Sequence, residues 1–129
     1  TFEEALISFM GNSATAVVMY NLGKYRANAL LDKRSLSPID DEPESLGAIL
    51  RLLEREGLAR IRDLQHSSGG GEAVIENNID REEQRVTPGS FYIKGFLERV
   101  FQTLPNKKVD IKIDVLGKTV KLCWREIPT

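Results

Sequence analysis

The single histidine and the single cysteine are the first candidates for chemistry, because these side chains often serve as bases, nucleophiles and metal ligands. His66 stands beside serines and a run of three glycines, whereas Cys123 stands between a leucine and a tryptophan. One thiolate cannot form a zinc site by itself, and an isolated histidine near a loop is rarely catalytic. We therefore expect no metal ion and no cofactor.

The glycine run, Gly69 to Gly71, is the next candidate, because glycine-rich loops can cradle phosphate groups. A phosphate-binding loop also carries a lysine and a serine or threonine at fixed spacing and opens a helix. Here neither partner is present and a strand follows. We interpret residues 66–73, HSSGGGEA, as a flexible loop that places His66 at the surface. Without a nucleotide fingerprint or a paired acid and base, the sequence does not indicate an enzyme.

Aromatic residues are concentrated in residues 88–104, PGSFYIKGFLERVFQTL. Apolar residues recur there at helical spacing, with Thr87 as a cap and Pro88 at the first helical position. This stripe has two interpretations: it lines a pocket for an apolar, aromatic or lipid-like molecule, or it fills the core. For the first interpretation we assign the ligand-binding residues Phe91, Tyr92, Phe96, Val100, Phe101 and Trp124.

Three further helices are predicted before this one. Residues 2–10 form a short amphipathic helix, and the longest pattern covers residues 14–36. A third helix ends at Gly57, which suits a left-handed C-cap. In the longest helix the expected inner stripe is Ala14, Val17, Val18, Leu22, Tyr25, Ala29 and Leu30. Small residues there, and Gly95 in the aromatic helix, indicate that another element approaches the backbone closely.

The remaining segments predict strands. Residues 58–65 alternate weakly and residues 73–79 read as a second strand, while the charged run Asp80 to Arg85 is expected to be a solvated loop. The closing hairpin turns at Gly117 and has the clearest period of two. Its expected inward residues are Val109, Ile111, Ile113, Val115, Val120, Leu122 and Trp124. The prediction is an α+β fold: an antiparallel sheet of about four strands with helices packed on one face.

Length and composition limit the possible classes of protein. The chain has 129 residues, which suits one domain over 1–129, with 41% hydrophobic and 29% charged residues. A formal net charge of -1 speaks against nucleic-acid binding. No apolar run is long enough to cross a membrane, and one cysteine fits a cytoplasmic, reducing compartment.

The order of the segments YNLGKYRANAL, LEREGLARI, VIENNI and SFYIKGFLERVF, followed by a hairpin, resembles the four-vinyl-reductase domain family of predicted hydrocarbon-binding domains. The resemblance rests on Gly23, Gly57, Asn77, Asn78, Tyr92, Gly95, Phe96 and Leu97. It implies a fold shared with the TRAPP vesicle-tethering subunits, and a ligand-binding or scaffolding domain that is often dimeric through its helices. Some relatives hold zinc through cysteines near the hairpin, where this chain has only Cys123.

The leading hypothesis is a non-enzymatic domain that binds or senses an apolar small molecule between the aromatic helix and the sheet, and that signals through protein contacts. The alternative is a TRAPP-like interaction module that dimerises and carries no ligand. A reductase-type enzyme is the weakest of the three. The expected partners are a second copy, through the helix of residues 14–36, or another protein. That helix carries more apolar surface than one face can bury: Val17, Val18, Met19, Leu22, Leu30 and Leu31.

Overall fold

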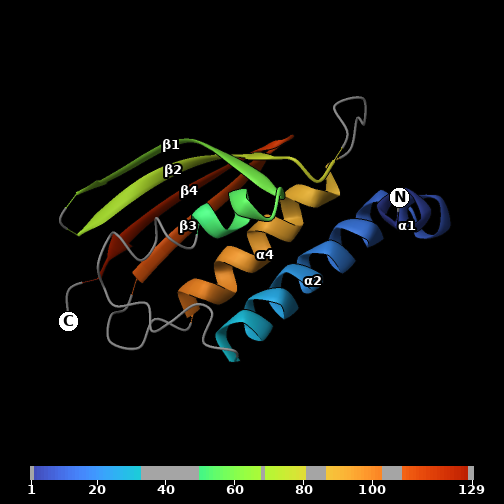
Figure 1. Cartoon of the computed structure of the whole chain (residues 1–129), viewed down its shortest axis with the longest axis horizontal. Coiled ribbons are helices and arrows are strands. Elements are labelled where there is room, and N and C mark those ends of the chain that lie inside the picture. The colour runs from blue at the N-terminus through green and yellow to red at the C-terminus, as the bar shows by residue number, and fades with distance from the viewer. Residues whose placement is uncertain (1, 33–49, 68, 81–86, 103–108, 128–129) are drawn as a thin grey trace.

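The computed structural model describes residues 2–32, 50–67, 69–80, 87–102 and 109–127. Its helices are α1 (Phe2–Met10), α2 (Asn12–Asp32), a helical segment at residues 50–55, and α4 (Pro88–Gln102). Its strands are β1 (Ala59–Ser67), β2 (Gly70–Asn77), β3 (Val109–Leu116) and β4 (Thr119–Glu126). The sheet forms one layer and the helices lie together on one side of it, so the predicted α+β class is confirmed (Figure 1).

The four strands are all antiparallel and stand in the order β1-β2-β4-β3. β2 and β4 are therefore central, and β1 and β3 are the two edges of the sheet described here. The predicted alternation of the hairpin is confirmed: Val120 and Leu122 of β4 are buried, while β3 alternates between half-buried and exposed residues. The inward residues of β3 stay half-buried because an edge strand has a neighbour on one side only.

The glycine-rich segment contradicts the predicted flexible loop. Gly70 and Gly71 belong to β2, and His66 and Ser67 belong to β1, where His66 pairs with Gly71. A Cβ atom at Gly71 would overlap the ring of Trp124, and one at Gly70 would lie 2.6 Å from the Trp124 carbonyl oxygen. The glycines are thus needed for close approach of β4 rather than for a flexible turn.

β1 alternates weakly in sequence because the strand is irregular in structure. The register between β1 and β2 shifts between Ile61 and Asp63, which leaves Arg62 as an extra residue. Because a bulge inserts one extra residue, the alternation of inward and outward side chains is interrupted at that point. Arg62 forms an ion pair with Glu76 of β2, on the solvent side of the sheet.

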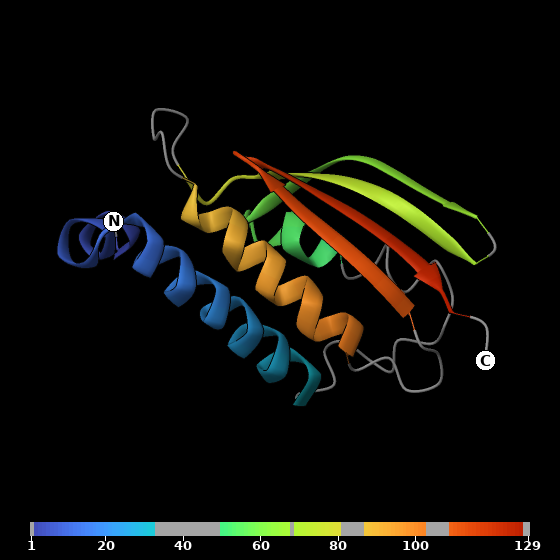
Figure 2. The same cartoon turned by 180° about the vertical axis from the view of Figure 1, so that it is seen from behind.

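α4 lies between the sheet and α2, and most of its length is buried (Figures 1 and 2). The large buried side chains of α4 are Ile93, Phe96, Leu97, Val100 and Phe101. They form one cluster with Leu50, Leu53, Ala73, Ile75, Val120 and Leu122 from the other helical segment and the central strands. The stripe predicted for this helix is therefore the core of the protein.

α2 and α4 run side by side in the same direction and touch through glycine (Figures 1 and 2). A Cβ atom at Gly95 would overlap the carbonyl oxygen of Tyr20, and one at Gly23 would overlap the carbonyl oxygen of Tyr92. The close approach predicted at Gly95 is confirmed. Each helix contributes one glycine to the contact.

The predicted face of α2 is correct at Leu30 and wrong at Val17 and Tyr25. Its buried stripe is Thr15, Met19, Gly23, Ala27 and Leu30, whereas Val17 and Tyr25 from the predicted stripe are 59% and 73% exposed. The side with the smallest side chains faces α4, because only that side permits the glycine contact. Apolar residues that looked internal are left on the solvent side of the helix.

Two helix ends follow their sequence signals. Gly11, with φ +85°, separates α1 from α2, and Gly57, with φ +76°, ends the helical segment as predicted. Residues 33–36 of the predicted long helix, residues 81–85 of the charged run and Leu104 lie outside the described residues.

Candidate functional site

A pocket of about 320 Å³ opens between the C-terminal half of α4 and the inner face of β3. α4 contributes Glu98, Phe101 and Gln102 to its lining, and β3 contributes Val109 and Ile111. The volume is at the lower end of the range of small-molecule sites, and polar and apolar groups contribute about equally to the lining. The pocket therefore lies at the contact between α4 and an edge strand of the described sheet.

One wall of the pocket is acidic and held in place. The Tyr20 hydroxyl of α2 donates a hydrogen bond to the Glu98 carboxylate. The same tyrosine ring receives the Lys24 ammonium group 4.6 Å from its centroid. Arg99, one residue further along α4, donates a hydrogen bond to the Asn28 side chain of α2. Contacts with α2 therefore hold Glu98 in the polar wall of the pocket, to which Gln102 also belongs.

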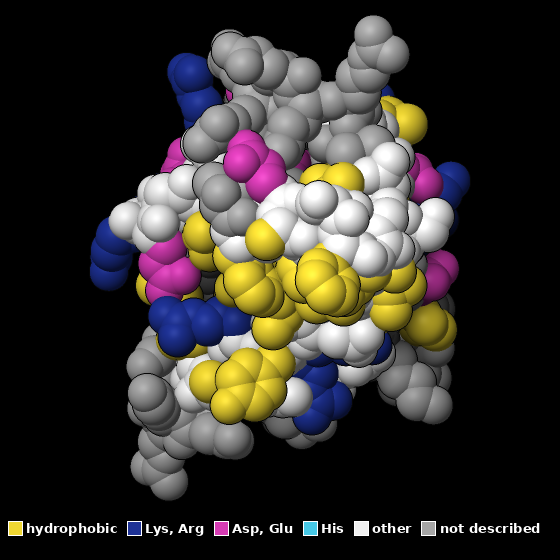
Figure 3. Space-filling model, turned by 90° about the vertical axis from the view of Figure 1, so that its right-hand side faces the viewer, with side chains coloured by type: hydrophobic (Ala, Val, Ile, Leu, Met, Phe, Trp, Pro, Cys, Tyr) yellow, Lys and Arg dark blue, Asp and Glu magenta, His cyan; other side chains and the backbone are white. Residues whose placement is uncertain are grey.

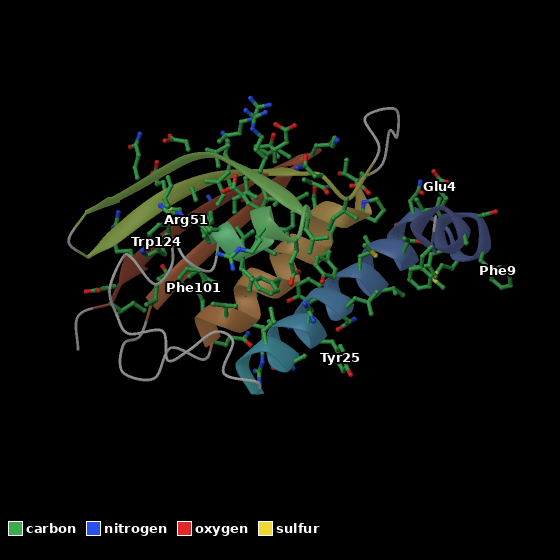
Figure 4. The ribbon with its side chains drawn as sticks, in the orientation of Figure 1. Glu4, Phe9, Tyr25, Arg51, Phe101 and Trp124 are labelled. Carbon is green, nitrogen blue, oxygen red and sulfur yellow. The ribbon has the colours of Figure 1, made fainter. Side chains whose placement is uncertain are left out.

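The apolar floor of the pocket continues into the core through an aromatic pair. Phe101 is 9% exposed, and its ring centroid lies 6.3 Å from that of Trp124, with the planes tilted by 40°. Both side chains lie between α4 and the sheet (Figure 4). The tilted arrangement is a favourable geometry for aromatic rings. The indole is thus in contact with a residue that lines the pocket.

The six residues predicted to bind a ligand are not gathered at one place. Phe101 lines the pocket and Trp124 lies behind it, whereas Phe96 and Val100 are each 1% exposed and belong to the packed core. Phe91 is half-buried near the start of α4 and is not among the pocket residues. The structure instead adds Glu98, Gln102, Val109 and Ile111, which sequence reasoning did not single out as ligand-binding.

Tyr92 lies on a different side of α4, near the crossing with α2. Burial raises the pKa of its hydroxyl, with Arg26 and Glu56 close enough to add smaller opposing effects. Arg26 of α2 and Glu56, which follows the helical segment, form an ion pair of 2.7 Å. That hydrogen bond and the charge of Glu56 raise the pKa of the Arg26 guanidinium. Tyr92 therefore packs beside a link between helices and not beside the pocket.

A buried polar network holds the N-terminus of α4. Asp80 is 4% exposed, and its two carboxylate oxygens accept hydrogen bonds from the Gly89 amide at 3.2 and 3.1 Å. Asn77 donates to both Asp80 and Ser90, and Ser90 donates to the Gly117 carbonyl at 2.7 Å. The expectation that Asp80 belongs to a solvated loop is wrong. A carboxylate at a helix N-terminus is favourable. Through Asn77, Asp80 and Ser90, the network links β2, α4 and the hairpin turn.

Cys123 is exposed on the outer face of β4, opposite in direction to Trp124 as the alternation predicted. Within the described residues, no group of three or more histidine, cysteine, aspartate or glutamate side chains could hold a metal ion. His66 lies in β1, and its side chain is outside the described part.

A second surface feature is an apolar face on the N-terminal helices. Figure 3 faces the end of the molecule where α1 lies, and hydrophobic side chains gather across it. The exposed hydrophobic residues of the two helices are Phe2, Phe9, Met10, Val17, Leu22 and Tyr25, and we call this set the N-terminal apolar face. Phe9 is 93% exposed, and both Phe9 and Tyr25 point away from the protein (Figure 4). Among residues predicted at a dimer contact, Met19 and Leu30 are buried, Val18 is half-buried and the Leu31 side chain lies outside the described part.

Comparison with known proteins adds no family assignment: no family model matches the chain, and no curated protein matches it. The resemblance to the four-vinyl-reductase family gains no support from these comparisons. Among the described residues, no helix is both long and apolar enough to span a bilayer.

Proposed function

We propose that this chain is a non-enzymatic binding domain that takes up a small apolar molecule in the pocket between α4 and β3. The observation that carries the proposal is the pocket itself, with Phe101, Val109 and Ile111 as apolar walls. Its position agrees with the expected location between the aromatic helix and the sheet. A ligand there would rest on the Phe101 side of the core, while Phe96 and Val100 give the floor its rigidity.

The polar wall narrows the class of ligand. Glu98 and Gln102 offer a carboxylate and an amide at the rim. An anionic ligand such as a fatty acid would meet the Glu98 charge, whereas a hydroxyl or amine group could donate a hydrogen bond to it. We therefore propose a neutral or cationic molecule with an apolar body, such as an aliphatic or aromatic alcohol, in preference to a carboxylic acid.

Native mass spectrometry of the purified protein tests whether an apolar molecule is retained, and calorimetric titration with decanol and decanoate tests the preference. We expect decanol to bind more tightly than decanoate, and Glu98→Gln to reduce the difference. Because Trp124 is the only tryptophan and contacts Phe101, ligand binding should also change the fluorescence of the wild-type protein.

A blocking variant separates the pocket from nonspecific apolar surface. Gln102→Trp places a large side chain at the mouth of the pocket, and Gln65→Trp makes the same change at an exposed glutamine of β1. We expect Gln102→Trp to abolish decanol binding and Gln65→Trp to leave it unchanged. Equal binding by both variants would contradict the pocket as the site.

The alternative function is an interaction module, and the N-terminal apolar face favours it. A contiguous exposed apolar patch of a few hundred Å² usually marks an interface, and twofold pairing of identical chains is the commonest way to cover one. The occupant in this alternative is a second copy, which would present the same apolar helices in return. Phe9→Glu and Tyr25→Glu, both at exposed positions, should lower the sedimentation mass if this face carries the contact. An unchanged mass would leave ligand binding as the function.

A further inference from the structure

The outer edge of β3 carries a second feature that the proposed ligand site does not use. Within the described residues, no strand pairs with that edge, because β3 stands last in the order β1-β2-β4-β3. β3 pairs with β4 without a register shift over its whole length, from Val109 to Leu116. An unbroken edge strand presents a regular row of backbone donors and acceptors to another strand.

The hairpin turn determines which backbone groups point outward. The register leaves Gly117 and Lys118 as a two-residue turn, and in such a hairpin the flanking pair, Leu116 and Thr119, is hydrogen-bonded. The opposite ladder agrees with this, since the Asn77 amide donates to the Lys118 carbonyl at 2.7 Å. Hydrogen-bonded pairs alternate along an antiparallel ladder, so the even-numbered residues of β3 bond to β4. The amides of Ile111, Ile113 and Val115 therefore point to the free edge.

The solvent face of β3 has a charge pattern that complements itself. Asp110, Lys112 and Asp114 alternate in sign on this face, and Lys112 lies 3.9 Å from Asp114. In the register with β4, Asp110 lies opposite Arg125 and Asp114 lies opposite Lys121, but Lys112 lies opposite the uncharged Cys123. Lys112 is therefore the only one of these three residues that has no oppositely charged residue facing it on β4.

Charge also selects between the possible pairings of two copies of β3. A twofold axis at Lys112 would place that lysine opposite its own copy and Asp110 opposite the partner's Asp114, and like charges directly opposite are destabilising. An axis at Ile113 pairs residues 110–116 with the same residues of a second copy. It places Lys112 opposite the partner's Asp114, and the reverse contact occurs by symmetry. An axis at Ile111 pairs fewer of the described residues.

We propose that the edge of β3 binds a second copy of this chain, strand to strand and antiparallel, with Ile113 facing the partner's Ile113. The two sheets then join into one continuous sheet. Two Lys112–Asp114 pairs form on its solvent face, and Ile111, Ile113 and Val115 gain apolar neighbours on its inner face. This surface is separate from the N-terminal apolar face, which belongs to α1 and α2.

Charge reversal combined with sedimentation equilibrium tests the proposal. Lys112→Asp and Asp114→Lys each place like charges opposite one another, and both side chains are exposed, so the variants should fold normally. We expect each variant to weaken association by about tenfold or more, because both symmetric pairs are lost. The double variant Lys112→Asp/Asp114→Lys restores opposite charges and should recover the mass of the wild-type assembly.

Asp110→Lys is the matched control, since it makes the same change on the same face of the same strand. With the axis at Ile113, Asp110 faces the partner's Leu116, so this variant should associate as the wild type does. A wild-type mass of one chain, 14.5 kDa, at tens of micromolar would overturn the proposal. Dissociation by Asp110→Lys and not by Asp114→Lys would overturn the register.

Amide hydrogen exchange adds a test that distinguishes edge pairing from any other contact. The amides of Lys112 and Asp114 bond to β4 and should be protected at every protein concentration. Those of Ile111, Ile113 and Val115 should be protected only when the protein is associated, and should exchange rapidly in Lys112→Asp. Rapid exchange at these three amides in an associated wild-type protein would overturn the proposal, whatever its mass. Ligand binding is measured separately, so either proposal can fail alone.

Discussion

The two edges of the sheet differ in how they are finished. At the β1 edge the strand contains a bulge, Arg62 is paired with Glu76, and residues 50–55 lie on the same side of the protein (Figures 1 and 2). At the β3 edge the strand is regular and its inward residues stay half-buried. Bulges and covering elements are the usual means by which proteins protect an edge from pairing. The β3 edge lacks the bulge, and its inner face opens into the pocket.

The difference indicates where the protein is available for contacts. Burial of the inward side chains does not separate the two edges, since Ile61 and Leu64 of β1 are half-buried as well. Among the described residues, the regular strand and the pocket both lie on the β3 side. Binding surfaces commonly lie where a rigid scaffold leaves apolar surface uncovered.

Two truncation variants compare the free energy that packing contributes near β1 and on β3. Leu53→Ala removes a fully buried side chain and should lower the free energy of unfolding by about 2–5 kcal/mol. Ile113→Ala removes a half-buried one on β3 and should cost about half as much or less, because part of its surface is already in contact with water.

Urea unfolding measures both values. The measurement belongs in the Lys112→Asp background, where association through β3 would not add to the cost of Ile113→Ala. Similar costs for Leu53→Ala and Ile113→Ala would show that the β3 side is as well packed as the β1 side.

The position of α4 matters to both sides of the protein, because this helix packs on β2, β4 and β3. Its position depends on the glycine contact with α2, where a Cβ atom at Gly95 would overlap the Tyr20 carbonyl oxygen. Gly95→Ala should therefore destabilise the protein by about 1–3 kcal/mol, although helix propensity alone predicts a gain of about 1 kcal/mol.

Thermal or urea unfolding decides the sign of the Gly95→Ala effect. Gln102→Ala, at an exposed position of the same helix, serves as the control and should stay within about 0.5 kcal/mol of the wild type. A stabilised Gly95→Ala protein would mean that the helices can separate at little cost, and that α4 is not fixed by this contact.

Several elements could be predicted from sequence because a local pattern determines them. The hairpin has a strict period of two. Gly95 lies inside a helix, where glycine is unfavourable unless another element packs closely against it. Both predictions are confirmed, as is the left-handed conformation of Gly57.

The failures come from residues whose role depends on tertiary contacts. Gly70 and Gly71 looked like a loop because glycine serves both turns and close approach, and only the position of Trp124 distinguishes the two. Asp80 was expected to be solvated because its neighbours in sequence are charged, but its carboxylate accepts hydrogen bonds from the Asn77 side chain and the Gly89 amide. On α2, hydrophobic content favours Val17 and Tyr25 as buried residues, but the side that carries Gly23 and Ala27 makes the contact with α4.

The candidate site was predictable in location and not in composition. The aromatic helix and the hairpin both carried strong signals, so a site between them was a reasonable expectation. The pocket, however, depends on β3 being an edge, and that follows from the strand order β1-β2-β4-β3. Consecutive pairing of the predicted strands does not specify that order. The sequence correctly predicts that Val109 and Ile111 face inward, but not that they line a pocket.

The smallest expected effect is a pH dependence of stability that arises from Tyr92, on the side of α4 near α2. Burial raises the pKa of Tyr92 above its usual value of 10.0. The folded protein therefore keeps this proton at a pH where the unfolded chain has begun to lose it. When the native state holds more protons than the unfolded state, stability falls as pH rises. The Tyr92 contribution is fully present below about pH 10 and is lost as the pH rises through the higher, folded-state value.

Tyr92→Phe removes this titration and keeps the aromatic ring. We expect the free energy of unfolding of the wild type to fall more steeply than that of Tyr92→Phe above about pH 9. Below that pH the difference between the two proteins should be constant. Tyr25→Phe, which removes a hydroxyl at a position that is 73% exposed, is the matched control. Equal slopes for the wild type and Tyr92→Phe would show that the side of α4 facing Arg26 and Glu56 is as open to water as the β3 side, and the contrast between the two sides would then rest on packing alone.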